Sequence, residues 1–184
     1  EPAQAIVAHA RGADLVVIGQ PDPGDVDAPF GVELANAVVL ASGRPVLAIP
    51  YIGVQGTVGE TVLIALDRSR ESARAIADAL PLLARARRVV VLAVTAAAEE
   101  TLGDTQARTE AVAHLRGHGI EAELHHLDLP DIGIGELLLS QAADFGADLI
   151  VMGAYGHARF QEMVLGGVTR TMLEAMTVPV LMSH

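Results

Sequence analysis

The sequence repeats one of its segments at a fixed distance along the chain. Residues 12–19, GADLVVIG, reappear as residues 146–153, GADLIVMG, 134 positions later (146 − 12). The tripeptide Pro-Val-Leu at 45–47 reappears at 179–181 with the same spacing (179 − 45). Because both matched segments keep one offset, the stretch between them has the same length in both copies, which indicates a tandem repeat.

A repeat unit of this length fits one small α/β domain. The second copy, residues 61–184, has room for the whole unit, whereas the first copy, residues 1–51, has room only for a C-terminal half. Residues 52–60 contain three glycines and are expected to link the copies. The sequence begins with Glu1 rather than Met, from which we expect a processed or truncated piece.

Apolar strands alternate with helical segments along the second copy. We expect strands at 61–66, 88–94, 121–127, 148–152 and 180–182, and helices at 72–85, 99–116, 134–145 and 167–175. Pro81 should kink or loosen the end of the first of these helices. Strands separated by helices of this length favour an α/β fold with a parallel sheet and right-handed crossovers. The core should consist of small aliphatic residues, because 51% of the residues are hydrophobic and only 3% are aromatic.

Charge and residue content exclude several classes of function. The formal net charge of -11 repels nucleic-acid backbones, so we expect no nucleic-acid partner. The chain has no cysteine and all 12 of its basic residues are Arg, which excludes disulfides, thiolate metal sites and lysine Schiff bases. No apolar run is long enough to cross a bilayer, so we expect a cytoplasmic protein without a membrane partner.

A glycine-rich loop is the segment with the clearest chemistry. Residues 153–156 follow an apolar strand, and the Gly-Gly pair 166–167 precedes a helix. Glycine lets the backbone approach a ligand closely, and the amides of a helix N-terminus favour phosphate. In an open parallel sheet, ligands lie at the carboxyl ends of the strands, where Asp67 and Val94 also stand. The same glycines would suit a tight strand-to-helix turn, so the spacing alone leaves both interpretations open.

These features resemble the nucleotide-binding branch of the universal stress protein family. The resemblance rests on Gly-x2-Gly-x9-Gly after a strand, on the Asp that closes the first strand, and on the phrases ADLIVMGAYGH, GGVTRTML and VPVLMSH. It covers residues 61–184 and, in the first copy, only the corresponding last third to half. It implies a flavodoxin-like, adenine-nucleotide α-hydrolase-like sheet of five parallel strands in the order 3-2-1-4-5, with helices on both faces. It also implies dimerisation through the last strands and ATP or a related adenine nucleotide in the cleft, with or without Mg²⁺.

The resemblance assigns nucleotide contacts to twelve residues. Asp67 would hydrogen-bond the adenosine, and Val94 would pack on the adenine. The expected set is Ala65, Leu66, Asp67, Val94, Met152, Gly153, Gly156, His157, Arg159, Gly166, Gly167 and Val168. Arg159 is a better phosphate candidate than His157, because its guanidinium is always charged. Gly167 departs from the family pattern, which has Ser or Thr there; the lost hydroxyl should weaken binding by about 0.5–1.5 kcal/mol.

The first copy lacks the residues that this site needs. At the positions that match Gly156 and Gly167 it has Asp22 and Glu33, whose carboxylates would repel a polyphosphate. We therefore expect the first copy not to bind nucleotide. Its strand at 15–18 would also lack a neighbour, so we expect another chain to cover that edge, or the missing half to have been lost after folding.

Three functions are compatible with these features. The first is a nucleotide-binding regulatory protein that acts through a ligand-responsive dimer. The second is an interaction module that works by dimerisation alone, and the third is a slow ATP-hydrolysing enzyme, for which no general base is evident. His114 and His118 have the i, i+4 spacing of metal ligands on a helix but lack a third ligand, so we expect no tightly bound metal.

Overall fold

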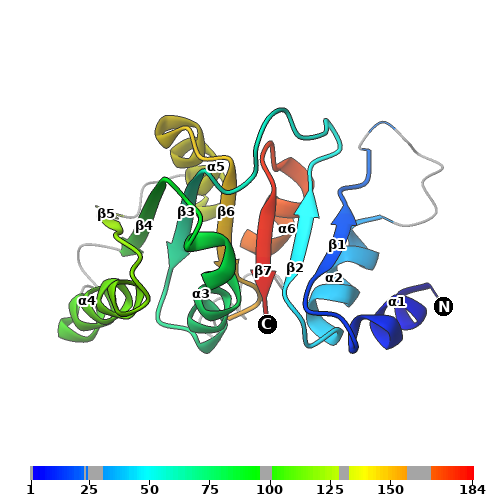
Figure 1. The fold of residues 1–184 in the computed structure, drawn as a ribbon. Coiled ribbons are helices and arrows are strands. Elements are labelled where there is room, and N and C mark those ends of the chain that lie inside the picture. The colour runs from blue at the N-terminus through cyan, green and yellow to red at the C-terminus, as the bar shows by residue number, and fades with distance from the viewer. Residues whose placement is uncertain (1, 23, 25–30, 96–100, 129–132, 157–166) are drawn as a thin grey trace.

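The computed structural model describes residues 2–22, 24, 31–95, 101–128, 133–156 and 167–184, which form a seven-stranded sheet with helices on both faces (Figure 1). The strands are β1 (Val16–Gly19), β2 (Val46–Ile49), β3 (Thr61–Leu66), β4 (Arg88–Thr95), β5 (Glu123–Asp128), β6 (Leu149–Gly153) and β7 (Val180–Ser183). The helices are α1 (Pro2–Ala10), α2 (Val32–Ala41), α3 (Arg70–Leu83), α4 (Leu102–Gly117), α5 (Ile134–Phe145) and α6 (Gly167–Ala175). Among these described helices, none is long and apolar enough to cross a membrane.

The strands lie in the order β1-β2-β7-β6-β3-β4-β5. All neighbouring pairs are parallel except β2 and β7, which are antiparallel. The expectation of a five-stranded, all-parallel sheet is therefore wrong in strand number and overall order, because β2 joins the edge of β7 and β1 follows it. Within residues 61–184 the strands run β5-β4-β3-β6-β7, which is third, second, first, fourth and fifth along that segment.

Strand β7 has no free edge in this sheet. It pairs with β6 on one side and with β2 of the same chain on the other. The dimer contact expected through the last strands is therefore unavailable at the edge of β7, because an intrachain pair already occupies it.

Apolar side chains fill both faces of the sheet. Val38 of α2, Ile150 of β6 and Met172 of α6 are fully buried in one cluster. Ile76 of α3 and Leu115 of α4 belong to a second cluster on the opposite face. Because the central strands are covered on both sides, their sequences are continuous apolar runs rather than alternating ones.

The first four elements match the last four in order and spacing. Helix α1, strand β1, helix α2 and strand β2 precede α5, β6, α6 and β7 by about 134 residues. Two pairs of backbone hydrogen bonds recur at this offset: Val16 N to Pro45 O (3.0 Å) with Ile150 N to Pro179 O (3.0 Å), and Gln20 N to Ile49 O (2.7 Å) with Ala154 N to Ser183 O (2.8 Å). The repeated sequence therefore forms the same local structure at both places.

The antiparallel pairing of β2 with β7 is symmetric in its register. Leu47 lies opposite Leu181, and these two residues are themselves 134 positions apart. The flanking pairs are Val46 with Met182 and Ala48 with Val180, so each strand presents equivalent positions to the other. A local two-fold axis thus passes through the pair of leucines.

Candidate functional site

Candidate residues of β3, β4 and β6 lie near one another at the carboxyl ends of these three strands. Ala65 of β3 pairs with Met152 of β6, and Leu66 of β3 pairs with Ala93 of β4. From β3 the chain passes through β4 and β5 on one side and returns to β6 on the other, so the strand order reverses at β3. Crevices at such switch points are the usual ligand sites of open α/β sheets.

The apolar candidates divide between the two faces of the sheet. Ala65, Val94 and Met152 pack with the cluster beneath α5 and α6. Leu66 packs with the cluster beneath α3 and α4, because successive side chains of a strand point to opposite faces. A ligand on the α5–α6 side would therefore meet the side chains of the first three residues and only the backbone of Leu66.

Asp67 has a clear structural role at the start of α3. Its Oδ1 accepts hydrogen bonds from the backbone N of Ser69 (2.8 Å) and from the hydroxyl of Ser69 (2.5 Å). Ser69 in turn caps the helix, since its Oγ accepts from the backbone N of Ser72 at 3.0 Å. The side chain of Asp67 remains exposed, so it can serve this turn and still face a ligand at the carboxyl ends of the strands.

The first two loop glycines are required by close packing. A Cβ on Gly153 would lie 2.5 Å from the backbone N of Ser72, and one on Gly156 would lie 2.6 Å from Oγ of Ser69. Both glycines therefore rest against the start of α3, in contact with the turn that Asp67 organises. The structure thus brings the glycine loop and Asp67 together, although this packing alone explains why glycine stands at 153 and 156.

Tyr155 ties the loop to the N-terminal part of the chain, which the sequence did not indicate. Its backbone has φ 61, a left-handed conformation that is uncommon for a residue other than glycine. Its hydroxyl donates a hydrogen bond to Oδ1 of Asn36 in α2, and its ring lies edge-on to His184. Burial raises the pKa of the Tyr155 hydroxyl, so it stays protonated and able to donate.

Glu71 is a buried carboxylate beside the loop that sequence reasoning missed. Only 4% of the residue is exposed, and its Oε2 lies 2.8 Å from the place that a Cβ on Gly156 would take. Burial by itself would raise the pKa of Glu71, but the hydrogen bond and charge of Arg70, a hydrogen bond from its own backbone amide and the charge of His184 together outweigh it, and the pKa lies below its ordinary value. The helix was predicted to begin at residue 72, so Glu71 was not assigned to it; the structure places Glu71 in the first turn of α3, where carboxylates are common.

The second half of the loop is described only from Gly167 onward. His157, Arg159 and Gly166 lie outside the described residues. Gly167 begins α6 and is exposed, and a Cβ there would meet nothing within 4 Å. Val168 is half-buried, whereas the next hydroxyl along the chain, that of Thr169, belongs to a residue only 2% exposed. Thr169 therefore faces the core and does not replace the hydroxyl missing at 167.

Comparison with known proteins identifies the family to which the chain is similar. The model of the universal stress protein family matches residues 60–184. The chain belongs to the universal stress protein family. No curated protein matches the sequence.

Solved structures of universal stress proteins share the fold. One from Archaeoglobus fulgidus DSM 4304 is 19% identical with a TM-score of 0.75; the match covers 100% of this chain and 66% of that one. A family member from Burkholderia pseudomallei is 25% identical with a TM-score of 0.53, covering 70% and 98%. A universal stress protein from Archaeoglobus fulgidus in complex with dAMP is 22% identical with a TM-score of 0.50, covering 68% and 98%. This chain thus spans slightly under two thirds of the first of these relatives.

The family match begins one residue before β3 and contains every candidate site residue. No group of three or more His, Asp or Glu side chains that could hold a metal occurs in the described part of this universal stress protein. The rings of His114 and His118 contact each other edge-on, with centroids 4.8 Å apart.

Proposed function

We propose that the protein binds an adenine nucleotide at the carboxyl ends of β3 and β6 and acts as a cytoplasmic stress-response regulator. The observation that carries this proposal is the contact between the glycine loop and the Asp67 turn at the point where the strand order reverses. The dAMP bound to the Archaeoglobus fulgidus relative supports the choice of ligand class.

Each group of residues at these strand ends has a role in the proposed nucleotide binding. Ala65, Val94 and Met152 provide an apolar floor for the base, and the Asp67 carboxylate accepts a hydrogen bond from the adenosine. The backbone of the glycine loop and the first amides of α6, from Gly167, bind the phosphates. Leu66 contributes its backbone, and His157, Arg159 and Gly166 complete the phosphate side, with or without Mg²⁺.

The charge beside the loop is compatible with a phosphate ligand. A lone buried carboxylate at Glu71 would repel it, but Arg70 pairs with this group and offsets the charge. The side chain of Arg70 is 83% exposed, so its guanidinium also lies within reach of solvent and of anions. The proposed activity is binding, and we propose no catalytic step.

We also propose that the chain consists of a complete domain and part of a second one. Residues 61–184 form the complete domain, residues 52–60 the linker, and residues 1–51 the C-terminal half of a first copy. The recurrence of four elements and two backbone hydrogen bonds at one offset supports this organisation. In the first copy, Asp22 and Glu33 are exposed where the site would need amides, so that half binds no nucleotide.

The ligand response would reach the first copy through Tyr155. This residue lies inside the glycine loop and bonds to Asn36 of α2. A ligand that repositions the loop would therefore change a contact between the two copies. In this proposal the β2–β7 pair takes the place of a dimer contact through the last strands.

Isothermal titration of ATP with magnesium tests the nucleotide proposal. Intact protein should bind with micromolar affinity, and Asp67→Ala should lose the binding while circular dichroism shows that it is folded. Asp22→Ala is the matched control, because Asp22 is also exposed and its Oδ1 also accepts a backbone hydrogen bond, from Gly24 at 2.8 Å. No heat from any of the three proteins, with no copurified nucleotide by mass spectrometry, would overturn the proposal. An interaction module without nucleotide, whose glycines serve only packing, would then be favoured.

A further inference from the structure

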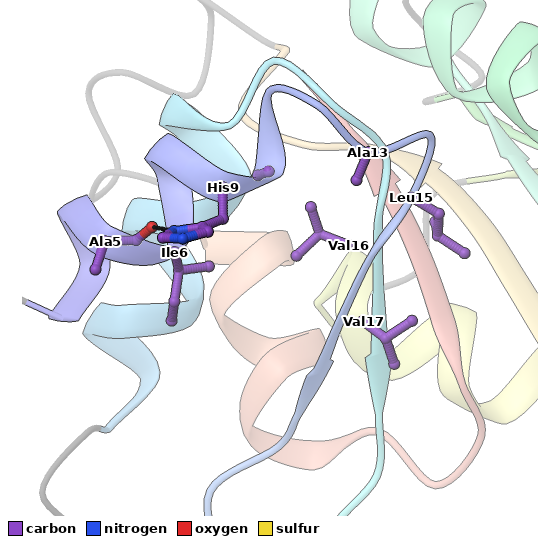
Figure 2. A pocket seen from close by; sticks show the side chains of 8 residues that line it. Ala5, Ile6, His9, Ala13, Leu15, Val16 and Val17 are labelled. Carbon is purple, nitrogen blue, oxygen red and sulfur yellow. Dashed lines mark hydrogen bonds between the residues drawn. The ribbon is translucent and has the colours of Figure 1, made fainter.

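An apolar hollow of about 430 Å³ lies beside the free edge of β1 (Figure 2). Ile6 and His9 of α1 form one side of it, and Leu15, Val16 and Val17 form the other. Figure 2 shows Val16 pointing toward α1, while Leu15 and Val17 point away from that helix. Because side chains alternate along a strand, Leu15 and Val17 share the face of β1 that α1 and α2 do not cover.

The two outer strands of the sheet differ in how they protect their edges. Strand β5 has the sequence ELHHLD and exposes the charged Glu123. Strand β1 has the sequence VVIG, and Val17 is 60% exposed. Proteins usually protect edge strands with charges or coverings, and an exposed apolar edge is a template for pairing with another strand. The edge of β1 therefore resembles a surface that binds another strand, and not an edge that is protected against pairing.

The equivalent positions in the second half of the chain show what covers such an edge. Leu149 and Val151 of β6, which match Leu15 and Val17, have no exposed surface. Strand β3 pairs with β6 in parallel, with Ile64 opposite Val151. Helix α3 lies over the same face, with Ile76 in the cluster that contains both β6 residues. A strand and the helix that follows it thus bury together what β1 leaves exposed.

The backbone of β1 is oriented for the same pairing. The amides of Val16 and Gln20 donate toward β2. Since amides alternate in direction along a strand, those of Val17 and Gly19 face the free edge. In β6 the amides of Ile150 and Ala154 likewise donate toward β7, and β3 occupies the other side. A parallel strand would therefore meet the same pattern of donors and acceptors at β1 as β3 meets at β6.

We propose that β1 binds a strand–helix unit of the β3–α3 type, that is, a parallel apolar strand followed by an amphipathic helix. The strand pairs with the free edge and fills the hollow, and the helix covers Leu15 and Val17. A second copy of this chain is a poorer occupant, because antiparallel pairing of two β1 strands would join the edges without bringing a helix over these side chains. The inference rests on the proposed repeat and not on nucleotide binding.

The chain's own β3–α3 sequence is a suitable probe. A fluorescent peptide of residues 57–85 is titrated with the intact protein and followed by anisotropy. Saturable binding is expected, and Val17→Lys should weaken it at least tenfold, because it places a charge in the centre of the apolar face. Leu102→Lys is the matched control, since Leu102 is an apolar residue of α4 that is 92% exposed, and it should bind as the intact protein does. A peptide with Ile64→Asp should fail to bind.

Two further measurements distinguish a strand–helix unit from a second copy of the chain as the partner of β1. Hydrogen exchange should slow at the amides of Val17 and Gly19 when the peptide is added, and stay unchanged in β5. Absence of peptide binding to a monomeric protein would overturn the proposal. So would a dimer in light scattering that Val17→Lys dissociates, because the occupant would then be a second copy. Titration of Val17→Lys with ATP separates this result from the nucleotide proposal, since that site lies on other strands.

Discussion

At the scale of single residues, the loop glycines have different reasons to be glycine, and substitution should separate them. A methyl group on Gly153 would collide with the backbone N of Ser72, which cannot rotate away, so Gly153→Ala should lower the free energy of unfolding by about 1–3 kcal/mol. Gly167→Ala places its methyl in open space and should change stability by less than about 1 kcal/mol. Urea unfolding followed by circular dichroism measures both. Equal losses in the two variants would contradict the packing described for the loop.

Gly167 also offers a gain-of-binding test. Gly167→Ser restores the hydroxyl that the family pattern has at this position, and one net hydrogen bond of about 0.5–1.5 kcal/mol corresponds to roughly a 2- to 12-fold tighter complex. Titration of ATP into both proteins measures the ratio of dissociation constants. Unchanged or weaker affinity in Gly167→Ser would mean that the phosphates do not approach the start of α6.

The sequence indicated which residues belong to the candidate site at the strand ends, but not which contacts hold them in place. Asp67 and Gly153 could be placed at strand ends because strands and helices alternate regularly along the chain. The burial of Glu71 and the bond from Tyr155 to Asn36 could not, since each depends on contacts between segments far apart in sequence. Local patterns carry no information about such contacts.

At the scale of elements, an ion pair joins the neighbouring strands β4 and β5 and makes stability depend on pH. Arg88 binds Glu123 through two hydrogen bonds, Nε to Oε1 at 2.9 Å and Nη2 to Oε2 at 2.8 Å. These bonds lower the pKa of Glu123 from 4.5 to about 2. Since the folded-state pKa is lowered, the stabilisation is complete above pH 4.5 and disappears as the pH falls toward 2.

Glu123→Gln should therefore be less stable than the intact protein near neutral pH, and the two should converge as the pH falls from 4.5 toward 2. Thermal unfolding across this range measures the difference. Glu121→Gln, which removes a carboxylate 82% exposed and 3.8 Å from Arg116, controls for the loss of one charge. A stability difference that stays constant across the range would contradict the role of the ion pair.

Element type followed from sequence more readily than element pairing. Strand β5 (Glu123–Asp128) forms where a strand was predicted at 121–127. Helix α3, predicted at 72–85, continues to Leu83 with Pro81 inside its last turn. The antiparallel pairing of β2 with β7 was not predictable, because VLAI and VLMS are short apolar runs that specify neither partner nor direction.

At the scale of the whole molecule, one apolar cluster crosses the junction between the two parts of the chain. It contains Val38 and Val46 from the first part and Leu63 and Ile150 from the second. Continuous packing of this kind makes unfolding cooperative, so we expect a single transition. Val38→Ala, at a fully buried position of α2, should destabilise the whole chain by about 2 kcal/mol.

Two spectroscopic probes can follow this transition. The chain has no tryptophan and two tyrosines, Tyr51 near the junction and Tyr155 in the glycine loop. Tyrosine fluorescence and far-UV circular dichroism should give coincident denaturation curves, and both should shift together in Val38→Ala. Two separate transitions, with only the earlier one shifted by the substitution, would show that the first part folds as an independent unit.

The two-fold register about Leu47 and Leu181 has a consequence for how the two halves can vary. In a homodimer with this symmetry, every substitution would appear on both sides of the axis, and dilution would separate the partners. Here both strands belong to one polypeptide, so tethering sets their effective concentration and the pair survives dilution. Each side can also change alone: glycine is kept at Gly156 while Asp22 stands at the matching place. The covalent link thus permits an asymmetric pair, in which one half keeps the proposed ligand site and the other is free to take a different task.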